Sequence, residues 1–524
     1  MKKYLAALWE KRGMVALAYA GFVTLVLPLY VKDGFNMIGD AKYDFFFRGS
    51  LLFVGIAFFF LLTGLTNIKQ WKDKGLSYGE LFALFFLITT VISFLFSPYR
   101  QDALWGYMDW HMGMILQGML MFGFFVSKRW TTQHRLVSYM AWAAALIVCT
   151  LTILNRCGED PLGFYRNMDW FEWNRRNLLA TIGNINWLCC YLAVAVPVLL
   201  YFGWAAKGYW RIPALFGAWI GLGALFLQGS DAGWMDVGVM LLVLLWMSLD
   251  HLEQFIHFWE VAILFPLFWS IFSLFQVDLI LPYDVDLMGK CYSPLWLIPT
   301  AVILVILLFL IWYQKGGRKD FLQGGKIKKA VRLLIVLTAL AALLIFFLCQ
   351  VSDAVWMFFG SRSVLRMTDE WGSYRGILWK TAWQSYRQAP LIQKLYGVGP
   401  DCFVYAFNAM GATVNATGQW ENAIYANAHN ELLTMLINEG MLGLVTYIGI
   451  FISVLIKACK SAEKQPMAVW GVCVILCYLV NNIFAFQQVV STPFVFVVLG
   501  LMDGYVCETK KENNVRGKVD INKS

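Results

Sequence analysis

Charged residues are scarce in this chain. Asp, Glu, Lys and Arg make up 14% of its 524 residues, whereas a typical soluble domain contains about 25%. Hydrophobic residues make up 60% of the chain. They form long blocks without the polar face that a helix at the surface of a soluble protein needs. The shortage of charge therefore excludes an ordinary soluble globular protein and indicates an integral membrane protein.

Nucleotide- and metal-binding motifs are also missing. The sequence has no Walker loop and no GxGxxG fingerprint, so ATP-driven and dinucleotide chemistry are not expected. Its five histidines and eleven cysteines show no zinc-ligand spacing. We therefore expect no metal and no cofactor. Most cysteines lie inside apolar blocks, but Cys157, Cys291 and Cys402 lie in connections, where a disulfide between two of them is open.

What the chain has is a series of apolar blocks of about twenty residues, the length that crosses a bilayer core of about 30 Å. They predict an all-α, polytopic bundle of about 14 transmembrane helices. The region 211–249 fits either one hairpin or two full spans. The blocks are approximately 13–31, 45–66, 79–97, 112–127, 136–154, 178–203, 211–228, 233–249, 257–277, 294–313, 329–349, 439–458, 467–485 and 488–506.

Lysine and arginine alternate between the connections. The N-terminus, the C-terminal tail and every second connection are basic, which predicts that both termini are cytoplasmic in a cytoplasmic (inner or plasma) membrane. The connection 250–256 is an exception, because Asp250 and Glu253 are its only formal charges. The net charge of +9 mostly reflects this topology, so no nucleic-acid partner is expected.

Two connections on the predicted outer face are long. Loops of more than about 12–15 residues are usually functional or disordered. The longer loop is expected to fold, because it is rich in aromatic residues and has helical periodicity over Trp371–Gln388 and a turn at Tyr396–Pro400. The shorter one is 155–177. The predicted regions are 1–349 (N-terminal transmembrane helices), 350–438 (extracytoplasmic loop), 439–506 (C-terminal transmembrane helices) and 507–524 (cytoplasmic tail).

His429 lies near the end of the long loop. Counting twenty residues back from Lys457 places the outer membrane boundary near Ile437. If the helix continues, His429 lies roughly 12 Å above that boundary, where an imidazole can act as a base. Glu431 is then on a different face of the helix and does not pair with it directly. The competing interpretation is that His429 is only an interfacial polar residue.

The segment around His429 resembles the signature of the O-antigen ligase and O-antigen polymerase family, and 350–506 resembles its ligase-related region, which implies a GT-C-like fold. One departure is Asp231, which follows Ser230 where many relatives carry arginine. The resemblance rests on Ala428-His-Asn-Glu-Leu-Leu433, Glu439-Gly-Met-Leu-Gly443, Arg375-Gly-Ile-Leu-Trp379, Pro390-Leu391, Gly397-Val-Gly-Pro400 and Phe403, and more loosely on Gly183-Asn-Ile-Asn-Trp187 and Ala103-Leu-Trp-Gly-Tyr107.

The resemblance implies a bacterial membrane glycosyltransferase of cell-envelope polysaccharide biosynthesis that needs neither metal nor nucleotide sugar. Its implied partners are a glycan donor linked to a polyprenyl diphosphate such as undecaprenyl diphosphate, a glycan or glycolipid acceptor, and membrane lipid. His429 is the predicted base, Arg375 the predicted diphosphate ligand and Glu431 a further catalytic residue. The predicted substrate-binding residues are Arg175, Arg176, Asn430, Glu439 and Trp379.

Other candidates and interpretations remain open. For Arg375 the alternative is an ion pair with Glu370 or Asp369; for the aromatic candidates Trp371, Trp379 and Trp420 it is anchoring at the membrane interface. For the whole protein it is a lipid-linked glycan flippase or transporter, or a non-catalytic scaffold. Ligase, polymerase and protein glycosylation are not separated. The remaining candidates are Arg156, Arg166 and Arg366 for the diphosphate, and Asp231 and Asp236 for substrate contact.

Overall fold

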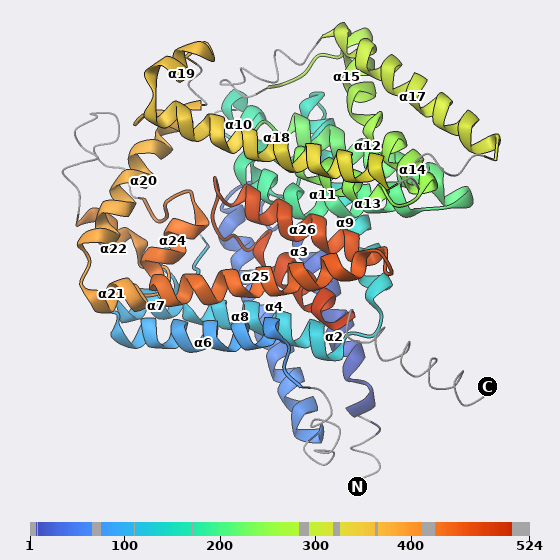
Figure 1. Ribbon diagram of the computed structural model, residues 1–524. Coiled ribbons are helices and arrows are strands. Elements are labelled where there is room, and N and C mark those ends of the chain that lie inside the picture. The colour runs from blue at the N-terminus through green and yellow to red at the C-terminus, as the bar shows by residue number, and fades with distance from the viewer. Residues whose placement is uncertain are drawn as a thin grey trace.

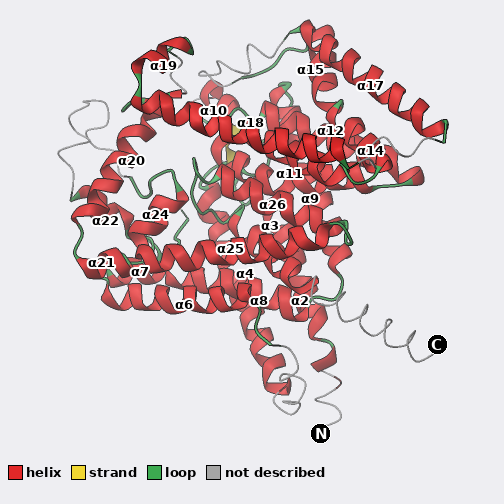
Figure 2. Cartoon of the chain, in the orientation of Figure 1, coloured by secondary structure: helices red, strands yellow, loops and turns green. Residues whose placement is uncertain are grey.

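The computed structural model is built almost entirely of helices (Figure 2). Its strands within the described residues are β1 (Leu178–Leu179) and β2 (Gly183–Asn184), which pair antiparallel. The structure describes residues 7, 9–64, 75–108, 110–166, 168–169, 171–281, 293–317, 325–361, 365–409 and 425–505.

Each predicted apolar block contains helical residues, which confirms an all-α polytopic bundle. The N-terminal helices are α2 (Arg12–Gly21), η1 (Phe22–Val26), α3 (Leu27–Leu29), α4 (Ile38–Gly64), α6 (Tyr78–Phe96), α7 (Arg100–Trp105), α8 (Met114–Trp130), α9 (His134–Arg156), α10 (Phe171–Asn177), α11 (Ile185–Ala205), η3 (Gly208–Trp210), α12 (Arg211–Leu227) and α13 (Ala232–Ser248). The others are α14 (Leu252–Ala262), α15 (Leu264–Leu274), η4 (Pro294–Trp296), α17 (Leu297–Lys315), α18 (Lys326–Val351), α19 (Asp353–Phe358), α20 (Trp371–Gln388), α21 (Leu391–Tyr396), α22 (Phe403–Asn408), α24 (Glu431–Asn438), α25 (Gly440–Ala462), α26 (Met467–Asn481) and the segment Thr492–Tyr505.

Ten helices in the described part of the chain are long and apolar enough to cross a membrane. Three shorter apolar helices, α13, α26 and Thr492–Tyr505, accompany them. Helices α12 and α13 are separate, so the region 211–249 forms two helices. The count of about 14 spans remains a prediction.

Helix α11 lies at the centre of the bundle. Most of its side chains are buried, and it packs against α9, α12 and α26. Helices α6 and α25 run side by side along another part of the bundle (Figure 1). Helices α17 and α18 are mostly exposed. Apolar side chains on such helices face lipid rather than a protein core, so their exposure is compatible with a membrane.

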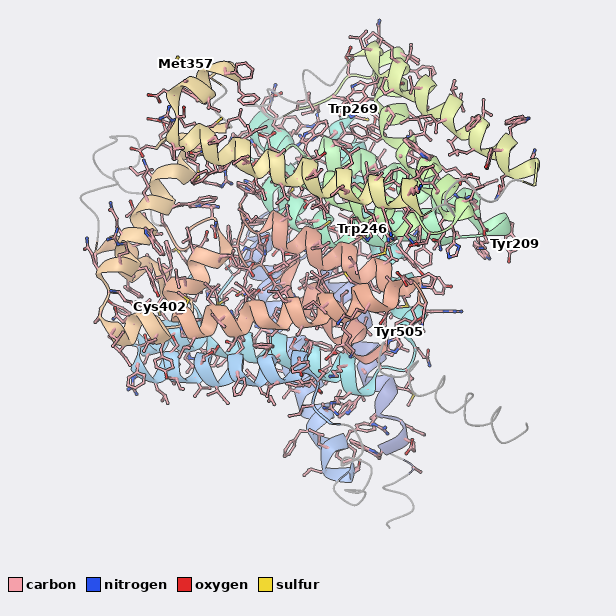
Figure 3. The ribbon with its side chains drawn as sticks, viewed as in Figure 1. Tyr209, Trp246, Trp269, Met357, Cys402 and Tyr505 are labelled. Carbon is pink, nitrogen blue, oxygen red and sulfur yellow. The ribbon has the colours of Figure 1, made fainter. Side chains whose placement is uncertain are left out.

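The loop elements α19 to α22 gather at one end of the bundle. Figure 3 shows Met357 and Cys402, both from the long loop, at that end and Tyr209 and Tyr505 at the opposite one. The predicted extracytoplasmic loop is therefore folded where the structure describes it. Cys157 and Cys402 are free thiols, so no disulfide joins them, and Cys291 lies outside the described residues.

The opposite end contains ion pairs between predicted cytoplasmic groups. Asp503 forms ion pairs with Lys128 at 2.6 Å and with Lys457 at 2.5 Å. Glu80 forms ion pairs with Lys128 at 2.6 Å and with Arg129. Groups from four segments distant in sequence thus meet at one end, as the alternation of basic connections predicts. Which end faces the cytoplasm remains a prediction.

The acidic connection 250–256 has a structural explanation. Helix α14 begins at Leu252, so the predicted boundaries of that connection were wrong and most of it is helical. Its carboxylates pair with bases from neighbouring segments: Glu253 with Lys207 at 2.8 Å, and Asp250 with Arg332 at 2.8 Å and with Lys328. The local charge is balanced across helices, which a count made along one connection cannot show.

Arg156 is a buried residue that connects several segments, not a cation at the surface. Its side chain is fully buried at the end of α9. The guanidinium donates hydrogen bonds to the carbonyl oxygens of Leu227, Gln228 at 2.7 Å, Arg176 at 2.9 Å and Ile280 at 2.8 Å. Because these donors are occupied, the interpretation of Arg156 as a diphosphate ligand was wrong. It joins α9 and the end of α12 to α10 and to the connection after α15.

Replacing Arg156 with Met is expected to lower the free energy of unfolding by about 3 kcal/mol, because several buried carbonyl groups lose a charged donor. Unfolding in detergent, followed by circular dichroism, measures the change. The matched control is Arg166→Met, since Arg166 is exposed. Equal stability of the two variants would contradict the assigned role.

Candidate active site

The helix that was expected to run from the membrane up to His429 is broken. Helix α24 ends at Asn438 and α25 begins at Gly440, whose φ of +70° is left-handed. A Cβ at Gly440 would lie 2.4 Å from the carbonyl carbon of Leu395. Only glycine fits this break. The assumption of a continuous helix was therefore wrong, and the height of roughly 12 Å derived from it no longer applies.

The turn Gly397–Gly399 clamps this break. The Val398 N–H donates to the Ile437 carbonyl at 3.0 Å, and the Gly399 N–H donates to that of Asn438 at 3.1 Å. Gly397 has a φ of +80°, and a Cβ there would lie 2.1 Å from the Asn438 oxygen. The glycine motif singled out in the sequence thus fixes the junction between α24 and α25.

His429 immediately precedes the N-cap of α24 and has a φ of +44°. The backbone N–H of His429 donates a hydrogen bond to Asn427 Oδ1 at 2.9 Å. Asn430 is the N-cap, accepting the Leu433 N–H on its side-chain oxygen at 3.0 Å. Trp379 Nε1 donates to the Ala428 carbonyl at 3.1 Å. Asn430 and Trp379, predicted to contact substrate, therefore use these polar groups to hold the segment that carries His429.

Aromatic rings surround this segment. The imidazole packs edge-on against Phe486, with ring centroids 5.3 Å apart. Trp379 packs against Trp371 at 5.4 Å and Phe484 at 6.0 Å. Sequence reasoning missed Phe484 and Phe486, because they come from the connection after α26 and no local motif marks them. They make the surroundings of His429 apolar.

Burial, and then the nearby charge of Arg375, lower the pKa of His429 to about 4. The imidazole is therefore neutral at physiological pH and able to accept a proton. Arg375 is itself partly buried, which lowers its pKa, and it lies within electrostatic reach of Asp231 and Cys190. The structure thus brings together His429 and Arg375, the two residues predicted to carry the chemistry.

Arg375 lies on α20, and its Nη1 donates to the Gly372 carbonyl at 2.7 Å. Asp369, one of its two suggested ion-pair partners, binds Lys380 instead. Periodicity over Trp371–Gln388 predicted this helix correctly, but Gly372–Tyr374 adopt left-handed backbone angles that periodicity does not reveal.

Glu431 is the first residue of α24 and is buried. Tyr478 donates to its carboxyl group at 2.9 Å, and Tyr447 and Asn482 donate as well. Burial raises the pKa of Glu431 to about 7, in opposition to these three donors, which favour the carboxylate. Since the donors come from α25 and the end of α26, the carboxyl group fastens α24 to the bundle. Glu439 is also buried, and both carboxyl groups line one cavity.

The remaining predicted cations have other contacts. Arg175 donates to the Gly158 carbonyl and lies 5.1 Å from the Phe171 ring centroid. Arg176 donates to the Leu281 carbonyl at 3.0 Å. Arg366 pairs with Asp353 at 2.5 Å. Trp420 lies outside the described residues.

Part of the chain is similar to a known protein family. Residues 297–448 match the family model described as O-antigen ligase. This matched region, 297–448, is called the O-antigen ligase domain below. This finding confirms the family resemblance predicted from the motifs. Compared with curated proteins, the chain has no match.

The O-antigen ligase domain extends from α17 through the long loop into α25. It includes Arg375, His429, Glu431 and Glu439, whereas the connection 155–177 precedes it. Together with the membrane-length helices, the domain supports a multi-pass membrane protein that ligates or polymerises glycan.

Replacing Gly397 with Ala is expected to displace the junction of α24 and α25, because the new Cβ meets a backbone oxygen at 2.1 Å. The positive φ adds about 1–3 kcal/mol of backbone strain. Thermal unfolding of the purified variant measures the loss. The control is Gly55→Ala, where a Cβ meets nothing within 4 Å; equal losses would show that the turn does not hold the junction.

Proposed function

We propose that the protein transfers or polymerises glycan from a polyprenyl diphosphate carrier on the outer face of a bacterial cytoplasmic membrane. The observation that carries the proposal is the placement of a neutral imidazole, His429, beside the cation Arg375 within the O-antigen ligase domain. A neutral base and a cation are the two groups that this reaction needs.

On the donor, the bond between the anomeric carbon and the diphosphate oxygen breaks. Both bonding electrons stay on that oxygen, so negative charge grows on the leaving diphosphate. The guanidinium of Arg375 offers planar, paired N–H groups to such an anion. Its partial burial strengthens the attraction, because less water screens the charges.

On the acceptor, a sugar hydroxyl oxygen forms the new bond to the anomeric carbon. Its proton passes to the free ring nitrogen of His429, which becomes an imidazolium next to the departing diphosphate. A pKa of about 4 makes the free imidazole a weak base, but the negative charge of the leaving group stabilises the imidazolium as it forms. The step needs no metal and no nucleotide sugar.

The alternative, a lipid-linked glycan flippase, requires polar groups along a path through the bundle. Asp236 on α13 is a buried carboxyl group of that kind, and it accepts a hydrogen bond from the side-chain amide of Asn481 at 2.8 Å. The O-antigen ligase domain and the clustering of the site in the long loop favour transfer. Ligase and polymerase share this donor chemistry, and the acceptor used distinguishes them.

Transfer by purified protein in lipid nanodiscs, with a polyprenyl-diphosphate glycan donor and candidate acceptors, tests the proposal. His429→Ala is expected to lower turnover by about 10²–10⁴-fold because the base is lost. Arg375→Ala is expected to lower it by about 10²–10³-fold because the leaving group loses a cation.

Two controls separate chemistry from folding. Arg387→Ala removes an exposed arginine from the same helix as Arg375, and His251→Ala removes an exposed histidine at the other end of the bundle. Both should retain wild-type turnover. Activity surviving in His429→Ala would refute the base assignment, and movement of intact donor across the bilayer by wild type would favour the flippase.

The dependence of transfer on pH provides a second test. Because the pKa of His429 is lowered to about 4, its neutral form persists as the pH falls, and turnover should decline only as the pH approaches that value. An unperturbed histidine would give half-maximal turnover near pH 6.5. Arg375→Gln removes the nearby positive charge, which is the smaller of the two causes that lower the pKa of His429. The pKa should rise slightly, and the residual activity of the variant should decline at a slightly higher pH. A decline centred near 6.5 in wild type contradicts the neutral buried base.

A further inference from the structure

A cavity lies beside the segment that carries His429. One face of α24 supplies Glu431, Thr434, Met435 and Asn438 to its lining. The rest of the lining comes from the residues on either side of α24, the first turn of α8 and the connection before it, Asp401, and the connection after α26. It measures about 510 Å³ with its open mouth included, but its inner part has room for only a few water molecules. An occupant can therefore insert one edge, not a whole sugar ring.

Four lining side chains have polar atoms without a hydrogen-bond partner among the described residues. They are three acceptors, Gln117 Oε1, Asn438 Oδ1 and Glu439 Oε2, and one donor, Trp110 Nε1. These side chains are between 1% and 7% exposed. Buried polar atoms without partners are costly, so several of them around one cavity point to an occupant that supplies both donors and acceptors.

The lining selects a neutral occupant. It contains three acidic residues, Glu431, Glu439 and Asp401, and no lysine or arginine, so it offers phosphate groups no cation. A metal ion fits poorly, because Asp401 already accepts the N–H groups of Tyr107 and Met112 and Glu431 already accepts three side-chain donors. Sugar hydroxyl groups both donate and accept, and therefore match the four free atoms.

The cavity is next to the proposed base. Asn427 lines it, and its side chain accepts the backbone N–H of His429. Phe486 also lines it, and its ring packs on the imidazole. We propose that the cavity binds the acceptor: one hydroxyl-bearing edge of a neutral sugar enters it, and a neighbouring hydroxyl group of the same sugar lies toward His429. The acceptor role rests on the proposed function, whereas the binding of a neutral sugar does not.

Binding is tested first, without donor. Saturation-transfer difference NMR on the full protein in nanodiscs measures affinity for glucose, galactose, mannose and N-acetylglucosamine. Glu439→Gln and Trp110→Phe, which change one free atom each with little change in shape, should weaken the sugar that binds wild type by about 3- to 10-fold. The matched control is Trp470→Phe, since Trp470 is also a buried tryptophan with an unpartnered N–H but lies on α26, away from the cavity lining.

Transfer kinetics separate the two proposals. With active wild type, Glu439→Gln and Trp110→Phe should raise KM for the acceptor by about 3- to 10-fold and leave KM for the donor unchanged. No sugar bound by wild type, or both variants binding and transferring as wild type does, overturns the cavity proposal. Sugar binding that responds to both variants in a protein without transferase activity supports the sugar site and overturns the proposed function alone.

Discussion

The site depends on one buried carboxyl group, that of Glu431. Removing a carboxyl group from water costs several kcal/mol unless donors compensate for it. Here Tyr447 on α25 and Tyr478 and Asn482 at the end of α26 supply those donors. The backbone N–H of Glu431 also donates to the Asn482 carbonyl at 2.9 Å. The first residue of α24 is thereby fixed to α25 and to the end of α26, and His429, two residues earlier, takes its position from these contacts.

Much of the fold could be predicted because its signals are local. Twenty apolar residues in a row are enough to indicate a helix that crosses a bilayer, whatever packs against it. The break before Gly440 could not be predicted in the same way, because a glycine inside an apolar run is compatible with a continuous helix. What breaks the helix is the close approach of Leu395 and the clamp by Gly397–Gly399, contacts between segments that no local pattern reveals.

The site was predicted in part for the same reason. His429 and Arg375 belong to short motifs, and the structure places them within electrostatic reach of each other. Asn430 and Trp379 belong to the same motifs, yet they cap α24 and hold Ala428. A sequence motif identifies residues that the fold needs. It does not distinguish the residues that position the site from those that would take part in the reaction. Arg156 shows the converse, because an arginine in an outer connection is internal once four carbonyl groups surround it.

Charge separates the surroundings of His429 into two regions. Arg375 supplies a partly buried cation within reach of the imidazole, whereas the polar groups that line the adjoining cavity include carboxyl and amide groups but no lysine or arginine. A diphosphate is attracted to the first region and finds no cation in the second. A neutral sugar has no such preference and binds where hydrogen-bonding atoms lack a partner. Under the proposed function, the same arrangement that favours each substrate in its own region opposes the reversed orientation. The imidazole then takes the proton of a hydroxyl group held in one region, and the oxygen of that hydroxyl group forms the bond to the anomeric carbon of the donor held in the other.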